Sequence, residues 1–339
     1  MVENTEKPSN NKPFLDKFSS WSDIFQDTSS PEKPNAVGVV IVIGLVLIVA
    51  GILSPSFFNP KNILNVLRQG SALGIMSIGQ TMVLIAGGID LSIVSTMQLA
   101  GVVAAAISSG QNALVPVAIF VCVLLGGMVG FANGWLVTRW NVPAYVATLS
   151  VSIVTTGMRL VATYGSPPGS VPELLRLLGN RKTGPIPNAI LLFGTFALIA
   201  GFVMNRTTFG RKIYAVGGNR TAAKLSGAKV DRVQLLTFVI SGILASFAGL
   251  VLVGYLGYAD QWIGQGTELD SIAAPIIGGA SFAGGIGSIS GMVLGVLLIS
   301  ALLNLVLLLS LPAEWQYIVR GLVIIFAVIL HSIGEKGNE

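Results

Sequence analysis

Long apolar runs without a charged side chain dominate the pattern of hydrophobic and polar positions along this chain. The charge-free runs cover residues 34–60, 69–89, 91–138, 140–158, 183–205, 233–259 and 271–313. A helix that crosses a bilayer needs roughly 20 consecutive apolar residues, so two of these runs have room for two crossings each. The pattern therefore predicts an integral membrane protein with several spanning segments.

The spanning segments are expected to be helices, because lipid offers no hydrogen-bond partner to an unpaired backbone amide. A transmembrane β-barrel would instead show segments of about ten alternating residues. We therefore expect an all-α integral membrane protein with about ten transmembrane helices and one short cytoplasmic helix. The expected spans are 36–53, 63–86, 92–109, 114–137, 144–162, 187–205, 233–256, 269–283, 286–309 and 315–331. Since 269–283 is short and rich in glycine, it either crosses the membrane or re-enters it.

Three regions follow from this pattern: a polar cytoplasmic tail at 1–35, a transmembrane domain at 36–332 and a short cytoplasmic tail at 333–339. The first tail lacks the apolar segment of a secretory signal peptide. Large apolar side chains recur within it at helical spacing, which fits either a helix on the membrane surface or a disordered tail with scattered aromatics. These side chains are Phe14, Leu15, Phe18, Trp21 and Phe25.

Composition agrees with the membrane class and excludes several kinds of site. Of 339 residues, 53% are hydrophobic and 10% charged, where a soluble domain has about a quarter charged. The lone Cys122 and the lone His331 exclude a disulfide framework and a His/Cys metal cluster. No Gly-x-x-x-x-Gly-Lys-Ser/Thr loop for ATP is found. We expect no catalytic residue, metal or cofactor, and the net charge of +5 indicates cytoplasmic loops rather than nucleic acid.

The distribution of charge between loops predicts the orientation. Segment 206–232 carries seven basic residues against one acid, Asp231, whereas 257–270 carries three acids and no base. Basic loops stay in the cytoplasm, so 206–232 is expected inside and 257–270 outside. Ten crossings then place both termini in the cytoplasm, although segment 163–186, with three bases, lies outside in this arrangement.

The stretch "GGNRTAAKLSGAKVDR", from Gly217, lies within the basic segment and predicts a small helix. Asn219 suits an N-cap and Gly227 suits the left-handed position after a helix, so we expect a helix over 220–226. Two turns of helix are not stable alone in water, and the helix must pack against something. It is either part of an ordinary basic loop or a docking helix for a cytoplasmic partner. Its small face would be Ala222, Ala223 and Ser226.

Three blocks carry a resemblance to a known family. "FGRKIYAVGGNRTAAKLSGAKV" resembles the cytoplasmic coupling segment of the bacterial ABC permeases for ribose and related monosaccharides. "GGIDLSIVSTMQLAGVVAAAI", from Gly87, is similar to the family's Gly-Ile-Asp-Leu-Ser motif. "APIIGGASFAGGIGSISGMVLGVLLISALLN", from Ala274, resembles its glycine-rich C-terminal block and is followed by "IVRGLVIIFAV". The likeness covers roughly residues 56 to 332.

The chain departs from the family pattern at a few positions. Many members carry a Glu after the Asn of the coupling segment, where this chain has Arg220 and Thr221. Val94 and Met292 stand where the family usually has Gly and Thr. The first departure bears on the charge that the partner presents, and the others bear on which sugar is carried.

The resemblance implies a transport subunit that performs no chemistry. A periplasmic sugar-binding protein would deliver a ribose-like monosaccharide, and two permease chains, identical or paralogous, would form the path through the bacterial inner membrane. A cytoplasmic ABC ATPase would dock on the coupling helix, at Gly218, Asn219, Ala222, Ala223, Lys224, Ser226 and Gly227. The alternative is a self-sufficient secondary transporter. It would need an ion site of buried carboxylates or unwound helices, for which Asp90 is the candidate.

Polar residues at membrane depth are candidates for the translocation path or its gate. Asp90 and Ser92 follow a glycine pair, so they either cap the next helix or shape the path. Gln80, Asn133 and Asn304, like Gln98, are neutral and lie inside expected spans. They either bind sugar hydroxyls or join helices.

Two further groups stand out within the apolar runs. Arg159 and Arg320 are each either a fixed charge near the translocation route or, as we expect, a side chain that extends along the helix with the guanidinium at the outer interface. Glycines cluster where helices are expected to break, which would let the backbone bend around a cavity. These glycines are Gly87, Gly88, Gly278, Gly279, Gly284 and Gly285.

Overall fold

The computed structural model describes residues 36–166, 169–312 and 314–336, with side chains from residue 43 to residue 325. The polar tail 1–35 and the surface helix considered within it lie outside the described residues. Helices make up nearly all the regular structure, as an all-α membrane protein requires. Within the described residues the only strands are β1 (Lys182–Thr183) and β2 (Ile186–Pro187), which pair as a small antiparallel hairpin.

The helices follow one another with short connections. In the first half they are α2 (Ala36–Leu53), the 3₁₀ turn η2 (Pro55–Phe58), α3 (Pro60–Ile85), α4 (Ile93–Ser108), the 3₁₀ turn η3 (Asn112–Leu114), α5 (Val115–Arg139), α6 (Ala144–Thr163) and α7 (Glu173–Gly179). In the second half they are α8 (Asn188–Arg206), α9 (Thr208–Gly218), α10 (Arg220–Leu225), α11 (Val230–Leu256), α12 (Thr267–Ile277), α13 (Ile289–Leu308) and α14 (Trp315–Lys336). The last helix thus extends past residue 332, where the membrane domain was expected to end.

Five helices in the described part of the chain are long and apolar enough to cross a membrane. They are α5 with its preceding turn, α6, α8, α11 and α13. Segment 269–283, expected either to cross or to re-enter the membrane, is not one helix. Helix α12 has 11 residues and is followed by a non-helical stretch to Ser288. At 1.5 Å per residue it covers about half of a hydrocarbon core roughly 30 Å thick.

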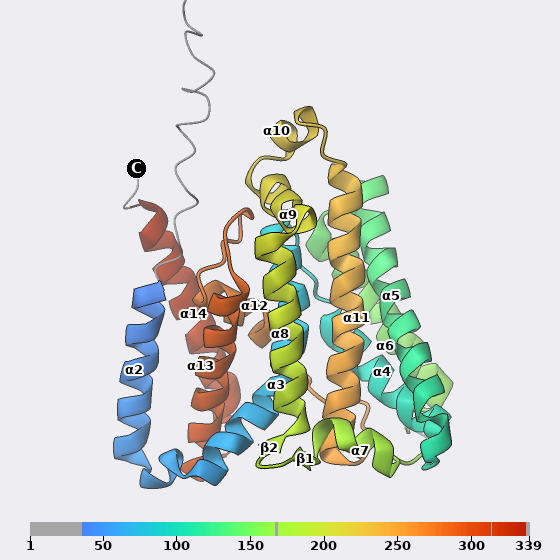
Figure 1. Ribbon diagram of the computed structural model, residues 1–339, viewed down its shortest axis with the longest axis vertical. Coiled ribbons are helices and arrows are strands. Elements are labelled where there is room, and N and C mark those ends of the chain that lie inside the picture. The colour runs from blue at the N-terminus through green and yellow to red at the C-terminus, as the bar shows by residue number, and fades with distance from the viewer. Residues whose placement is uncertain (1–35, 167–168, 313, 337–339) are drawn as a thin grey trace, which may run out of the picture. The chain divides into compact units, whose positions relative to one another are not determined.

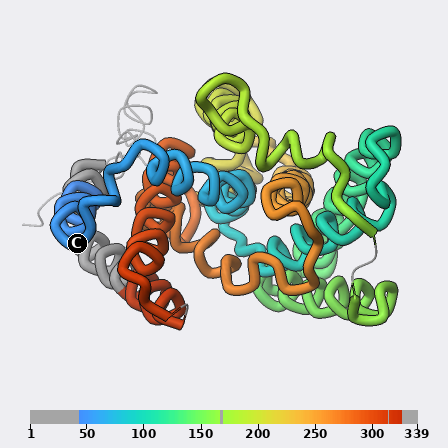
Figure 2. Tube along the Cα trace, turned by 90° about the horizontal axis from the view of Figure 1, so that it is seen from below, coloured from blue at the N-terminus to red at the C-terminus, as the bar shows by residue number. Residues whose placement is uncertain are grey.

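Helix α11 forms the centre of the bundle and contacts α3, α4 and α5 (Figures 1 and 2). Of its most apolar window, 67% is buried inside the protein, against 28% for α5 and α6 and 22% for α8. Small residues bring α11 close to α5. A Cβ at Gly126 would collide with the backbone of Gly242, and one at Gly130 would collide with that of Phe238. Such close approach is how membrane helices gain packing energy where no hydrophobic effect drives them together.

The two ends of the bundle differ in what they carry. Helices α9 and α10 lie at one end, while α7 and the β1–β2 hairpin lie at the other (Figure 1). Helix α2 begins, and α14 ends, towards the end that carries α9 and α10. The chain therefore presents its basic coupling segment at one end only.

Candidate functional site

The basic coupling segment forms two short helices whose caps explain their limits. Helix α9 begins after Thr207, whose side chain accepts a hydrogen bond from the N–H of Gly210. Asn219 separates the two helices and caps α10, its Oδ1 accepting from the N–H of Ala222 at 2.9 Å. Helix α10 covers Arg220–Leu225, and Gly227 adopts a φ of +81° directly after it. The helix expected over 220–226 is present and ends one residue earlier.

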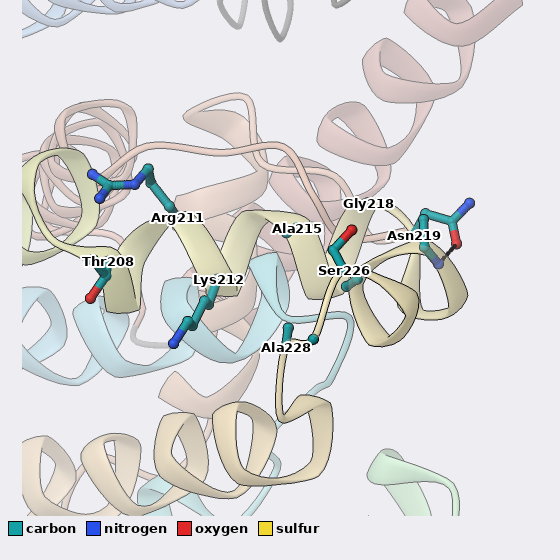
Figure 3. A pocket seen from close by; sticks show the side chains of 11 residues that line it. Thr208, Arg211, Lys212, Ala215, Gly218, Asn219, Ser226 and Ala228 are labelled. Carbon is teal, nitrogen blue, oxygen red and sulfur yellow. Dashed lines mark hydrogen bonds between the residues drawn. The ribbon is translucent and has the colours of Figure 1, made fainter. Parts of the chain in front are cut away.

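A hollow of about 580 Å³ lies between α9 and α10 (Figure 3). Its wall is made of small side chains and two bases, Arg211 and Lys212, which point in different directions from α9 (Figure 3). The other lining residues are Thr208, Ala215, Gly218, Asn219, Ala222, Ala223, Ser226, Gly227 and Ala228. The hollow is open at the surface of the protein and is lined mostly by small residues.

Ala223, which was expected on the docking face, borders the hollow but is itself mostly buried. Ala223 is 5% exposed and lies on the face of α10 that packs against the main hydrophobic core. Ala222 and Ser226 are exposed, and Leu225 is 84% exposed. Leu225 is therefore the large apolar side chain that α10 exposes to solvent.

Glycines from three distant segments meet where the coupling segment contacts the rest of the bundle. Gly285 at the α12–α13 loop donates its N–H to the carbonyl of Ile85 at the end of α3, at 2.9 Å. A Cβ at Gly217 would collide with that same carbonyl, and one at Gly284 would lie 3.0 Å from the Cα of Gly87. We call this set (Gly87, Gly217–Gly218 and Gly284–Gly285) the glycine junction. It places the coupling segment directly on the turn that carries Asp90.

The glycines expected to break helices all lie at helix ends or in loops. Gly278 caps α12, and the other five lie between helices. Four of the six have a left-handed φ between 75° and 89°, a conformation that favours glycine, namely Gly87, Gly279, Gly284 and Gly285.

Asp90 is the centre of a buried hydrogen-bond cluster. It is 1% exposed, and one carboxylate oxygen accepts from the N–H and the Oγ of Ser92 at 2.9 and 2.7 Å. The other oxygen accepts from the Oγ of Ser241 in α11 at 2.8 Å. Asn133 in α5 donates to the Oγ of Ser92 at 2.6 Å. Asp90 therefore joins α4 to α11 and, through Ser92, to α5.

The remaining polar candidates are not in that cluster. Asn304 in α13 exchanges two hydrogen bonds with Asn62 near the start of α3, at 2.9 and 3.1 Å. This reciprocal pair joins two helices. Gln80 is fully buried, and neither of its side-chain polar atoms has a hydrogen-bond partner among the described residues.

Arg159 was expected to extend to the outer interface, and the structure instead buries its side chain. It is 1% exposed and donates from Nη1 to Oε1 of Gln98 at 2.6 Å and from Nε to Oε1 of Gln261 at 2.8 Å. Gln98 in turn donates to the carbonyl of Ile263 at 3.1 Å. A guanidinium with a fixed fork of donors is suited to holding two amide side chains at once.

Arg320 was expected at the interface as well, and it is paired inside the bundle. Its Nε lies 3.0 Å from Oδ2 of Asp270, with the two side chains 14% and 2% exposed. The pair ties α14 to the first turn of α12. The sequence could have indicated this pair, because ionisable side chains within or next to apolar segments tend to pair with one another.

Basic side chains gather where α10 meets α11. A second hollow, of about 730 Å³, has five bases and one acid in its wall, namely Arg139, Arg220, Lys224, Lys229, Arg232 and Asp231. Arg220 and Asp231 form an exposed ion pair at 3.0 Å. The surface around α10 is therefore strongly positive and complements an acidic partner. No group of His, Cys, Asp or Glu among the described residues is placed to hold a metal.

Comparisons with known proteins cover almost the whole chain. A family model described as branched-chain amino acid transport system / permease component matches residues 62–328. The chain is 36% identical over 306 residues to the ribose import permease protein RbsC of Escherichia coli (strain K12), across 89% of this chain and 94% of that protein. It is 37% identical over 302 residues to RbsC of Bacillus subtilis (strain 168), across 87% and 92%. It is 32% identical over 362 residues to the xylose transport system permease protein XylH of Escherichia coli (strain K12), across 88% and 92%. No solved structure matches the chain.

Proposed function

We propose that this chain, which belongs to the family described as branched-chain amino acid transport system / permease component, is the permease of an ATP-driven importer. Its similarity to ribose permeases indicates a ribose-like monosaccharide as the substrate. The predicted resemblance to ribose permeases is confirmed by the matches above. The chain is a multi-pass inner-membrane transport subunit and not an enzyme. ATP hydrolysis belongs to a separate subunit.

The observation that carries the proposal is the likeness to sugar permeases along nearly the full chain. The family model takes its description from amino acid transport, whereas the relatives reported above are named for ribose and xylose. Relatives at 36–37% identity over about nine tenths of both proteins share the fold throughout, so the whole chain and not one motif favours a monosaccharide.

The ATPase is expected to dock on α10 and on the hollow between α9 and α10. The exposed side chain of Leu225, with Ala222 and Ser226 beside it, would enter a groove of the ATPase, and the surrounding bases would face acidic residues. This docking requires α10 to lie in the cytoplasm, as the basic loop indicates. Both ends of the membrane domain lie towards the same end of the bundle, which agrees with an even number of crossings and two cytoplasmic termini.

The Asp90 cluster is proposed as the support of the gate. Asp90 and Ser92 lock the turn between α3 and α4, and the glycine junction connects that turn to the coupling segment. Movement of α9 would therefore reach Asp90 without passing through a long chain of side chains. Gln80 and Asn133 keep buried polar atoms without a partner in the described chain, so water or a sugar hydroxyl can satisfy them.

The proposed function is tested by transport in proteoliposomes. The permease is reconstituted with its ATPase, with a second permease chain where one is encoded nearby, and with the periplasmic binding protein. Labelled ribose and xylose serve as substrates. Uptake is expected only with ATP inside and binding protein outside. Uptake by this chain alone, driven by an ion gradient, would establish the secondary transporter instead.

A further inference from the structure

A polar hollow of about 200 Å³ lies between α4, α6 and the turn that precedes α12. It is separate from both hollows at the coupling segment. Six of its ten lining residues are polar: Ser95, Gln98, Ser152, Thr156, Gln265 and Glu268. The others are Leu91, Val94, Leu149 and Trp262. Its volume is the room of about seven water molecules, which suits one small solute.

We propose that this hollow is a binding subsite for a single monosaccharide on its way through the permease. The inference rests on the proposed function, which it deepens by naming the residues that contact the sugar. A sugar presents many hydroxyls and one apolar C–H face, and the hollow offers both complements. Amide and hydroxyl groups line it, and Trp262, 52% exposed, offers a flat apolar ring to the C–H face.

Gln98 is the residue whose orientation is fixed most firmly. Its Oε1 accepts from Arg159 at 2.6 Å, and its Nε2 donates to the carbonyl of Ile263 at 3.1 Å. An amide group has two donors and two acceptor lone pairs, so one donor and one acceptor are left for a ligand. Arg159 thus acts as a positioning residue behind the hollow, and Gln98 presents a preset hydrogen-bonding pair to a sugar hydroxyl.

The wall of the hollow carries little charge. The only ionisable side chain in its wall is Glu268, whose Oε2 already accepts from the N–H of Gly266 at 2.9 Å. A sugar is neutral and needs no charged partner, and a carboxylate oxygen readily accepts a hydrogen bond from a sugar hydroxyl. The lining therefore agrees with ribose, the sugar for which two of the relatives reported above are named.

The polarity of the lining argues against lipid as the occupant of the hollow. Hydroxyl and amide groups turned towards hydrocarbon would lose their hydrogen bonds, at a cost of roughly 1–3 kcal/mol for each group. A polar depression in a membrane bundle is therefore filled by water or solute, or is covered by another chain. Because three separate segments form its wall, a shift of α6 against α4 would also open or close it.

Ser152→Leu is the main test, with Ser150→Leu as the matched control on the same helix. Ser152 lines the hollow, whereas Ser150 is exposed and does not line it. In the complete importer, Ser152→Leu is expected to lower ATP-driven uptake of ribose or xylose at least tenfold. Size-exclusion profiles of the detergent-solubilised permease should show as much folded Ser152→Leu protein as wild type, so that the loss of uptake is not a loss of folding. Ser150→Leu should transport at the wild-type rate.

Two further measurements keep the outcomes separate. Saturation-transfer NMR with the detergent-solubilised permease should show transfer from aromatic protons of the protein to ribose or xylose. Trp262→Leu should abolish this transfer, and added leucine should not displace the sugar. Normal uptake by Ser152→Leu, or an unchanged NMR signal in Trp262→Leu, would overturn the subsite. Failure of the proposed function would appear earlier, as absence of ATP-driven sugar uptake by the wild type.

Discussion

Gly217 of α9 lies so close to Ile85 at the end of α3 that a Cβ at residue 217 would collide with the carbonyl oxygen of Ile85. The same carbonyl accepts the N–H of Gly285 at 2.9 Å. Three segments that are far apart in the sequence thus share one backbone contact. Helix α9 leads directly into α10. A displacement of the coupling segment would therefore be transmitted to the C-terminal end of α3 and to the α12–α13 loop.

Gly217→Ala is expected to damage both stability and coupling. The added methyl meets backbone atoms, which cannot rotate away, and overpacking of this kind costs about 1–3 kcal/mol. Thermal unfolding of the detergent-solubilised permease should occur at a lower temperature, and ATP hydrolysis should no longer drive uptake. Gly201→Ala in α8 is the control, because a Cβ there meets nothing within 4 Å. Equal melting temperatures and equal uptake in both variants would contradict the glycine junction.

Replacement of Asp90 should show that its carboxylate organises three donors. Asp90→Ala leaves the N–H and Oγ of Ser92 and the Oγ of Ser241 without their acceptor. Each buried unsatisfied group costs about 1–3 kcal/mol, so this variant should lose several degrees of melting temperature and most of its transport. Asp90→Asn retains one acceptor oxygen and should fall between wild type and Asp90→Ala.

Ser241→Ala separates the two sides of the Asp90 cluster. It removes one donor to Asp90 and leaves the hydrogen bonds from Ser92 in place. We expect a smaller loss of stability than in Asp90→Ala, measured by the same thermal unfolding. A larger loss in Ser241→Ala than in Asp90→Ala would show that Asp90 is not the organising residue.

Leu225 and Ala223 should behave differently when each is replaced by an acidic residue. Leu225→Asp places a charge on an exposed position, so the permease should fold and insert normally while co-purification of the ATPase is lost. Ala223→Asp buries an unpaired carboxylate in the core and should reduce the amount of folded permease itself. Size-exclusion profiles report folding, and pull-down of the tagged ATPase reports docking. Retention of the ATPase by Leu225→Asp would remove Leu225 from the docking contact.

The ion pair between Asp270 and Arg320 can be tested by a double-mutant cycle. Asp270→Asn or Arg320→Gln alone leaves one buried charge without its partner, which typically costs about 3–5 kcal/mol. The double variant removes both charges, so its melting temperature should be higher than that of either single variant. Strictly additive losses would show that the two residues do not interact in the membrane-embedded protein.

The sequence by itself determined the class of the protein. Charge-free runs of this length are typical of membrane spans, and in lipid a helix satisfies the backbone hydrogen bonds of such a run within the segment itself. Local cap chemistry also sufficed for α10: Asn219 and Gly227 limit it through contacts within a few residues of chain. The family followed from motifs in order along the chain, and the relatives confirm it.

Only the tertiary structure decided what each polar or small residue contacts. Ala222 and Ala223 are neighbours with identical side chains, yet packing against α9 exposes one and buries the other. Arg159 and Arg320 were both expected at the interface, but each finds partners on other helices. Gly217, Ile85 and Gly285 meet although long segments separate them. Periodicity reports the burial of a helix face, whereas the identity of a partner across the bundle depends on how distant helices pack.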